Sequence, residues 1–212
     1  MATTARWAPI IVFCGLAAVA PAHAALDMTV KGQSSSSILQ INFTGSALAS
    51  LSGSTNLSNI GWSFSPLTFD PFPAGITGGD SGFFLATAGE AWLRNLSTGR
   101  ATQLIGVWFQ DSSNSPQPGM ERFGAITVGT YQAVDGDHFD WYGNLSIDLS
   151  TKGLTFADLS PGSTGWVAGG PVGMPASLTV SAVPEPAAAA LMLLGGAWLV
   201  AVRRRPSPVR PS

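Results

Sequence analysis

Residues 135–149 read Asp-Gly-Asp-His-Phe-Asp-Trp-Tyr-Gly-Asn-Leu-Ser-Ile-Asp-Leu, and from Phe139 onward the odd positions are mainly apolar. The even positions are polar and include His138, Asp140, Asn144 and Asp148. Because successive side chains of a strand point to opposite faces, this alternation predicts a strand with one buried and one exposed face. The Asp-Gly-Asp sequence before it predicts the tight turn that leads into the strand.

Six further stretches have the alternation or the short apolar runs of strands, and residues typical of turns separate them. They are residues 37–43, 82–87, 90–96, 103–110, 123–134 and 177–183. The stretch 103–110 is apolar on both faces, so we expect it in the centre of a sheet. This pattern predicts a mainly β fold, either an antiparallel β-sandwich or a jelly roll, and a barrel also fits it.

The N-terminal residues 1–24 have the order of a secretory signal peptide. A positive residue precedes an apolar run at 10–20, and Ala22 and Ala24 form a small-residue cleavage site. The run is shorter than the roughly 20 residues that a membrane-spanning helix needs. We therefore predict an N-terminal signal helix that is cleaved after Ala24. The only cysteine of the chain lies in this segment, so no disulfide is expected afterwards.

The C-terminal residues 183–212 combine a short motif, an apolar segment and a basic tail. In order they contain Pro184, Glu185 and Pro186, then the uncharged residues 187–202, then a tail at 203–212 that opens with Arg203, Arg204 and Arg205. As a helix the apolar segment would be about 24 Å long. This is short of the ~30 Å hydrocarbon core, but arginines that reach the headgroups extend the span. Because arginine clusters stay on the cytoplasmic side, this transmembrane helix would leave the preceding chain outside.

Together the two ends resemble the PEP-CTERM proteins, whose C-terminal signal has the same order of Pro-Glu-Pro, apolar helix and arginine cluster. The resemblance covers residues 183–205 together with the signal peptide. It implies two processing partners, signal peptidase at the N-terminus and exosortase, a membrane transpeptidase-like enzyme, near Pro184, Glu185 and Pro186. It also implies a Gram-negative host that makes extracellular polysaccharide.

The remaining residues 25–182, which we call the passenger, are enough for one β-rich domain with its own core. The passenger carries eleven of the chain's twelve acidic residues but only five of its ten basic ones, a net charge of about −6. Nucleic-acid binding is not expected, because phosphate contacts require clustered lysines and arginines.

The turn at the start of the quoted stretch offers three carboxylates, those of Asp135, Asp137 and Asp140, to a Ca²⁺ ion. Carboxylates and carbonyls in a tight glycine-containing loop suit a hard cation. The alternative is a plain Asp-Gly turn before a half-exposed strand, since the spacing of an EF-hand is missing. No other cofactor is expected, because the passenger has one histidine and no cysteine, too few for a zinc site.

Two features suggest enzymatic alternatives. Residues 79–82 read Gly-Asp-Ser-Gly and resemble the nucleophile motif of chymotrypsin-like proteases. In that family the histidine precedes the serine, whereas here it follows, so a protease is disfavoured. Glu90 and Glu121 could each pair with another carboxylate for glycoside hydrolysis, whose geometry is spatial.

Five tryptophans lie in the passenger, and core packing accounts for most tryptophans of this kind. Trp166, in a glycine-rich stretch, is the one that we expect to be most exposed and able to stack on a sugar ring.

These observations predict a non-enzymatic protein that is exported and anchored in the inner membrane with its passenger outside the cytoplasm. From there it would reach the cell surface or the extracellular matrix. A first alternative is a carbohydrate-binding β-sandwich, with or without calcium, that contacts extracellular polysaccharide. A second is a secreted hydrolase that uses acidic residues.

Overall fold

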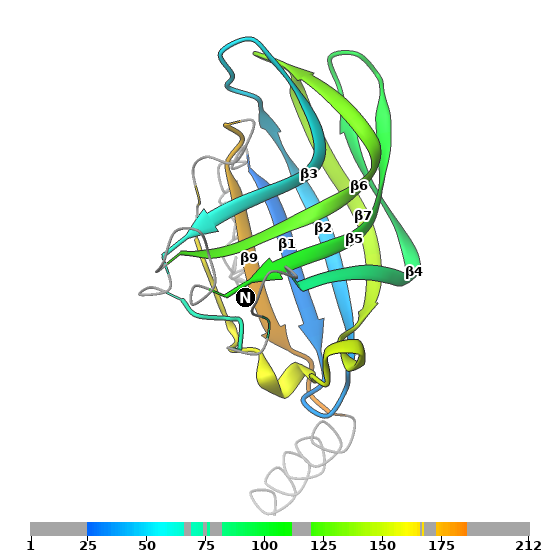
Figure 1. The fold of residues 1–212 in the computed structure, drawn as a ribbon, viewed down its shortest axis with the longest axis vertical. Helices are drawn as coiled ribbons and strands as arrows, with labels where there is room; N and C mark the ends of the chain where they lie inside the picture. The colour runs from blue at the N-terminus through cyan, green and yellow to red at the C-terminus, as the bar shows by residue number, and fades with distance from the viewer. Residues whose placement is uncertain are drawn as a thin grey trace, which may run out of the picture.

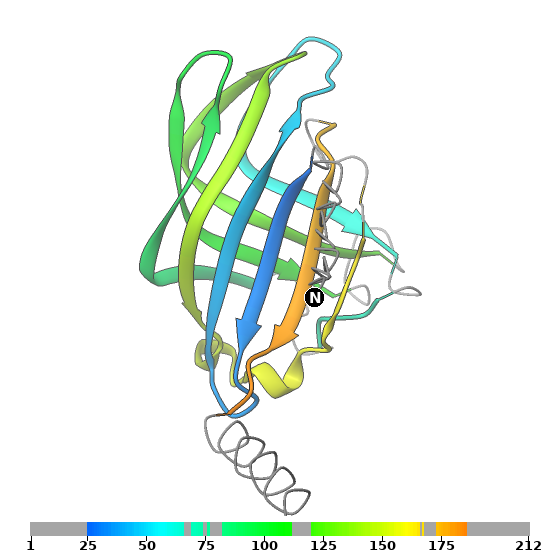
Figure 2. The same cartoon turned by 180° about the vertical axis from the view of Figure 1, so that it is seen from behind.

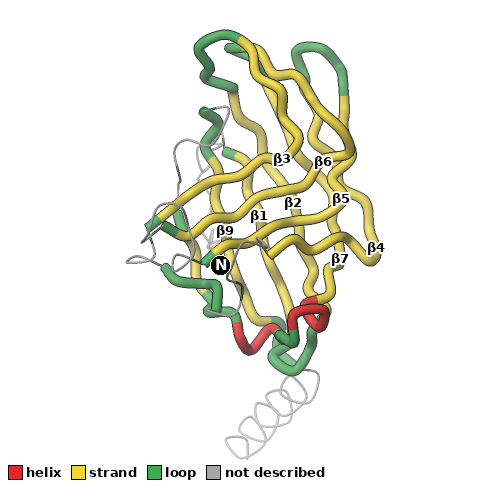
Figure 3. Tube along the Cα trace, in the orientation of Figure 1, coloured by secondary structure: helices red, strands yellow, loops and turns green. Residues whose placement is uncertain are grey.

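The computed structural model describes residues 25–65, 69–73, 76, 82–111, 120–165, 167 and 173–185, and most of them lie in strands (Figures 1 and 3). The strands are β1 (Leu26–Gly32), β2 (Ile38–Leu48), β3 (Ser54–Phe64), β4 (Gly82–Asn95), β5 (Ala101–Gln110), β6 (Glu121–Val134), β7 (His138–Asp148), β8 (Gly162–Ser163) and β9 (Ala176–Ala182). Two short 3₁₀ turns, η2 (Leu149–Lys152) and η3 (Phe156–Asp158), follow β7. The mainly β prediction is therefore confirmed.

The described strands form one curled, nine-stranded sheet in the order β3-β6-β5-β4-β7-β2-β1-β9-β8. The half made of β3, β6, β5 and β4 crosses in front of the half made of β7, β2, β1 and β9, as the two opposite views show (Figures 1 and 2). The prediction of an antiparallel sheet is wrong at one place, because β1 and β9 pair in parallel from Leu26 and Ala176 onward. The segment after β7 carries the chain back to the starting end of β1, so β9 runs in the same direction.

The alternation predicted for the quoted stretch is present in β7. Phe139, Trp141, Leu145 and Ile147 are buried, and the residues between them are half-buried or exposed. β7 lies between β4 and β2, so its apolar face meets the centre of the core. Strand β5, predicted to be central, indeed has β6 on one side and β4 on the other.

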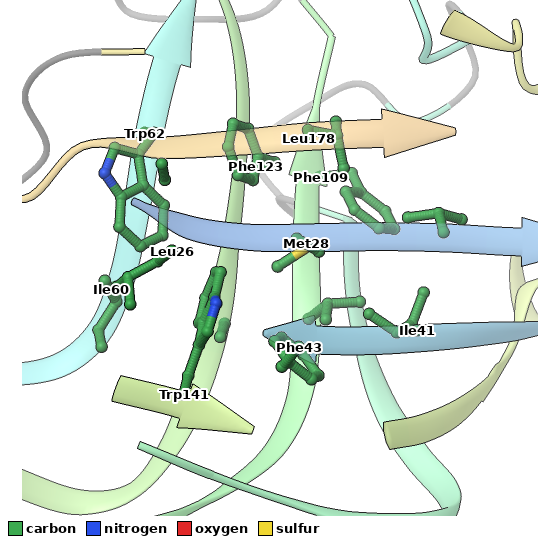
Figure 4. Packing of buried hydrophobic residues seen from close by; sticks show 14 of the residues in the cluster. Leu26, Met28, Ile41, Phe43, Ile60, Trp62, Phe109, Phe123, Trp141 and Leu178 are labelled. Carbon is green, nitrogen blue, oxygen red and sulfur yellow. The ribbon is translucent and has the colours of Figure 1, made fainter. Parts of the chain in front are cut away.

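Aromatic side chains fill the space between the two halves of the sheet (Figure 4). Trp62 stacks on Phe123 with ring centroids 5.5 Å apart, and its edge meets Trp141 at the same distance. Phe43 lies 5.0 Å from Trp141. Both buried indoles donate to carbonyl oxygens, Trp62 Nε1 to Met174 at 2.7 Å and Trp141 Nε1 to Thr44 at 2.8 Å. The core therefore ties β3 and β6 to β2 and β7.

The domain has two different ends (Figure 1). The connections at 49–53, 96–100 and 135–137 gather at the upper end. The turn at 33–37, the two 3₁₀ turns and the last described residues, 183–185, lie at the lower end. Among the described residues no helix is long and apolar enough to cross a membrane.

The predicted signal helix with Ala22 and Ala24, and the predicted transmembrane helix at 187–202, lie outside the described residues. The same holds for Pro186 and for Arg203, Arg204 and Arg205.

Candidate functional site

The turn that suggested calcium is held together by its own aspartates. Asp135 Oδ1 accepts a hydrogen bond from the backbone N–H of Leu51 at 2.9 Å, which fastens the β2–β3 connection to the β6–β7 turn. Asp137 is buried, and its Oδ2 accepts from the N–H of Val134 at 2.9 Å. Both carboxylates thus satisfy backbone donors that the turn leaves without a strand partner.

Asp140 lies on β7 and forms an ion pair across to β4. Arg94 Nη2 donates to Asp140 Oδ2 at 2.6 Å and Arg94 Nε to Oδ1 at 3.1 Å, a two-point contact that raises the pKa of the Arg94 guanidinium. The same guanidinium lies over the ring of Tyr142, 5.3 Å from its centroid. Asp135, Asp137 and Asp140 do not form a group of ligand atoms in the described part of the chain. This arrangement favours the Asp-Gly turn over the calcium site.

A different set of carboxylates comes together at the start of β6. Oxygens of Asp70, Asp111 and Glu121 lie within 4.8 Å of one another, the only such group of three among the described residues. Asp111 follows β5 and Glu121 opens β6, and Gln110 pairs with Arg122 in the same hairpin. Carboxylates at this spacing suit a hard cation. Because Asp111 and Glu121 also have protein partners, their proximity alone assigns no ion site.

The outer face of the sheet carries a row of aromatic and glycine residues across four strands. Phe83 on β4 is opposite Trp108 on β5, Trp108 is opposite Gly124 on β6, and Gly124 is opposite Gly61 on β3. A Cβ at either glycine would collide with the Trp108 ring. The indole therefore lies over β6 and β3, and only glycines leave room for it.

Phe83 and Leu85 are apolar residues that are exposed on this outer face. Phe83 is 48% exposed and Leu85 is 63% exposed, while Trp108 is half-buried. Large apolar side chains that gather on the surface of a domain commonly mark a binding site. We call Phe83, Leu85 and Trp108 the outer shelf.

A hollow of about 460 Å³ opens beside the outer shelf, between β4 and the end of β7. Its residues are Phe83, Phe84, Leu85, Ala86, Thr87, Asp148, Thr151 and Lys152. Ile147 pairs with Ala86, so the chain turns into η2 directly beside this part of β4. The hollow therefore has an apolar floor from β4 and a polar wall from η2.

The polar wall carries one charge of each sign. Asp148 Oδ1 caps η2 by accepting from the N–H of Ser150 at 2.8 Å. This hydrogen bond, with smaller contributions from the Ser150 and Ser37 side chains, lowers the pKa of Asp148. Lys152 is exposed and makes no ion pair within the described residues. Its ammonium group is available to a ligand in the hollow.

The remaining sequence candidates are scattered. Trp166 and the serine of the Gly-Asp-Ser-Gly motif lie outside the described residues. Of the two glutamates considered for glycoside hydrolysis, Glu90 is exposed on β4, whereas Glu121 is buried at the start of β6 with the carboxylates of Asp70 and Asp111 nearby. The alternation of β7 indicated an exposed polar face, but the outer shelf comes from strands whose sequence is apolar on both faces. The signal for it was Trp108 within the stretch 103–110.

The Pro-Glu-Pro sequence that we predict to be a sorting signal begins where the sheet ends. The N–H of Val183 donates to the carbonyl of Gly32 at 2.8 Å, which continues the β1–β9 ladder. Two residues later the Glu185 carboxylate accepts from Ser35 Oγ at 3.4 Å. Pro184 and Glu185 are exposed, and they adjoin the turn between β1 and β2.

No protein-family model, curated protein or solved structure matches this chain.

Proposed function

We propose that this chain is an exported, non-enzymatic surface or extracellular-matrix protein whose C-terminal Pro-Glu-Pro signal is processed by an exosortase. The passenger is first held at the inner membrane by the apolar segment 187–202 and is then moved to the cell surface or matrix. Signal peptidase and exosortase are its processing partners. The ends of the sequence, with their cleavage site, motif and arginine cluster, are the basis of this proposal.

The position of Glu185 is the structural observation that supports the proposal best. The last strand, β9, ends at Ala182, and Pro184 and Glu185 follow it within three residues at the lower end of the domain. They are exposed to solvent, with a single weak hydrogen bond from Ser35 to Glu185 at 3.4 Å. A membrane enzyme can therefore reach the motif without unfolding the sheet.

The mature termini of the protein test this proposal. The full chain is expressed in its native host, and cell and extracellular fractions are analysed by mass spectrometry. We expect the extracellular form to begin at Ala25 and to end near Pro184, Glu185 or Pro186. We expect Glu185→Ala to keep the residues after the motif and to stay in the membrane.

Ser35→Ala is the matched control, because it removes the only described side-chain partner of Glu185 and leaves the motif intact. It should be processed like the wild type. If the wild type and Glu185→Ala both retain Arg203 to Ser212 in the membrane, the segment is a plain anchor and the exosortase proposal is wrong.

A further inference from the structure

We infer that the hollow beside the outer shelf binds a saccharide, with pyranose rings stacked on Phe83 and the floor of β4 and their hydroxyl groups directed to η2. The inference does not depend on how the chain ends are processed, because the hollow is built by β4, the end of β7 and η2. It assigns saccharides as ligands of the hollow, whose residues do not include Asp135, Asp137 or Asp140.

The floor has the shape and chemistry of a stacking surface. Phe83 and Leu85 are separated by one residue on β4, so both side chains stand on the outer face. Trp108 is paired with Phe83 but lies over Gly124 and Gly61, on the side of β5 away from β4, so it continues the apolar surface outside the hollow. A pyranose with equatorial hydroxyls has two C–H faces, which pack on an aromatic or aliphatic surface of this kind.

The wall supplies the polar groups that the rim of a sugar needs. The carboxylate of Asp148 accepts from hydroxyls and the ammonium group of Lys152 donates. The hydroxyl of Thr151 donates to the carbonyl of Asp148 at 3.4 Å and can accept from a ligand. Asp148 is preorganised, because the backbone of Ser150 already holds one of its oxygens. The hollow therefore combines an apolar floor with a few convergent polar groups, the usual composition of a small-molecule site.

Its size and charge favour a saccharide over other ligands. The volume of about 460 Å³ lies in the range of small-molecule sites. A nucleic acid would require clustered cations, and Lys152 is the only cation among the described residues that line the hollow. A second copy of the chain packed on the shelf would bury Asp148 and Lys152 in a dry interface, which is costly unless each finds a partner.

Isothermal titration of the full chain in lipid nanodiscs tests the inference with three probes: cellohexaose, chitohexaose and hexamannuronate. We expect the wild type to bind at least one of them. Phe83→Ala should weaken that binding about five- to tenfold, as expected for the loss of one stacking contact. Trp108→Ala, which changes the apolar surface next to the hollow, should weaken binding less than Phe83→Ala. Lys152→Met should weaken the binding of hexamannuronate more than that of the two neutral probes.

Tyr142→Ala is the matched control, because Tyr142 is an exposed aromatic residue on β7 that does not line the hollow. It should bind like the wild type, and thermal unfolding should show that all variants remain folded. A wild type that binds none of the probes overturns the inference, as does equal binding by Phe83→Ala. A dimer in sedimentation experiments that Phe83→Ala dissociates also overturns it, because the shelf would then be a self-association surface. Since titration does not read the chain ends, failure here leaves the sorting proposal standing.

Discussion

The half of the sheet made of β3, β6, β5 and β4 has large aromatic side chains on both faces, but they are buried on the inner face and partly exposed on the outer face. On the inner face Trp62, Phe123 and Phe109 are almost fully buried, and the Trp62 indole has its hydrogen bond. On the outer face Phe83 is half exposed, and the buried Nε1 of Trp108 has no hydrogen-bond partner. The inner set is satisfied by the protein itself, whereas the outer set is only partly satisfied. Residue type alone therefore does not separate core from binding surface.

Trp62→Ala should produce the largest effect, because it removes the residue that joins β3 to β7 through Trp141. We expect a loss of about 3–5 kcal/mol in the free energy of unfolding, measured by urea denaturation followed by circular dichroism. Phe83→Ala on the outer face should change the free energy by about 0.5 kcal/mol or less. Similar costs for the two variants would mean that the outer shelf is part of the core.

Gly61→Ala tests whether Trp108 needs the space above Gly61, and it should have the next largest effect on stability. A Cβ at Gly61 would overlap the indole, which must then move off the sheet. We expect a destabilisation of about 1–3 kcal/mol, typical of overpacking, and weaker saccharide binding in the same titration.

The control for Gly61→Ala is the same substitution in a Trp108→Ala background, where the collision no longer exists. The double-mutant cycle should show that most of the cost disappears. If Gly61→Ala lowers the free energy of unfolding equally in both backgrounds, the position of the indole does not depend on a glycine at residue 61.

Much of the fold followed from alternation, which is clear wherever one face is buried and the other is polar. β7 was predicted with its faces correctly assigned because its outer face is polar at His138, Asp140 and Asn144. β3 was missed because its central residues Asn59, Gly61 and Ser63 look like a loop. Gly61 in particular has to be a glycine, because the Trp108 ring lies where its Cβ would be. β1 has a clear alternation at Leu26, Met28 and Val30, which the strand prediction passed over.

The candidate site was predicted less well, because a site depends on which strands become neighbours. The aspartates at 135–140 looked like ligands in sequence, but in the structure they bind Leu51, Val134 and Arg94. The hollow joins residues 83–87 of β4 to Asp148, Thr151 and Lys152, which follow them by more than 60 residues in the chain. A register shift between Leu104 and Gly106 also changes the alternation of β5 and turns Trp108 outward. No local pattern contains this information.

Asp137→Ala should have a smaller effect on stability than Trp62→Ala or Gly61→Ala. It removes the acceptor of the Val134 N–H, which we expect to cost about 1 kcal/mol in urea denaturation. Asp137→Asn keeps an acceptor oxygen and should recover most of that loss. Added Ca²⁺ should leave the midpoint of thermal unfolding unchanged in both variants and in the wild type. A rise in the wild type that Asp137→Asn abolishes would restore the calcium interpretation, because a ligand that binds the folded state stabilises it.

The smallest effect should come from the charge of Asp148 at the polar wall of the hollow. Folding lowers the pKa of this carboxyl from its usual 3.8, mainly through the N–H of Ser150. Its ionised form therefore stabilises the fold above the unfolded pKa, and this contribution is lost as the pH falls through the folded pKa. Asp148→Asn still caps η2 but does not titrate. The difference in unfolding free energy between wild type and variant should thus shrink as the pH is lowered from 5 to below 3.8. A difference that is independent of pH would mean that the hydrogen bond to Ser150, and not the charge of Asp148, stabilises η2.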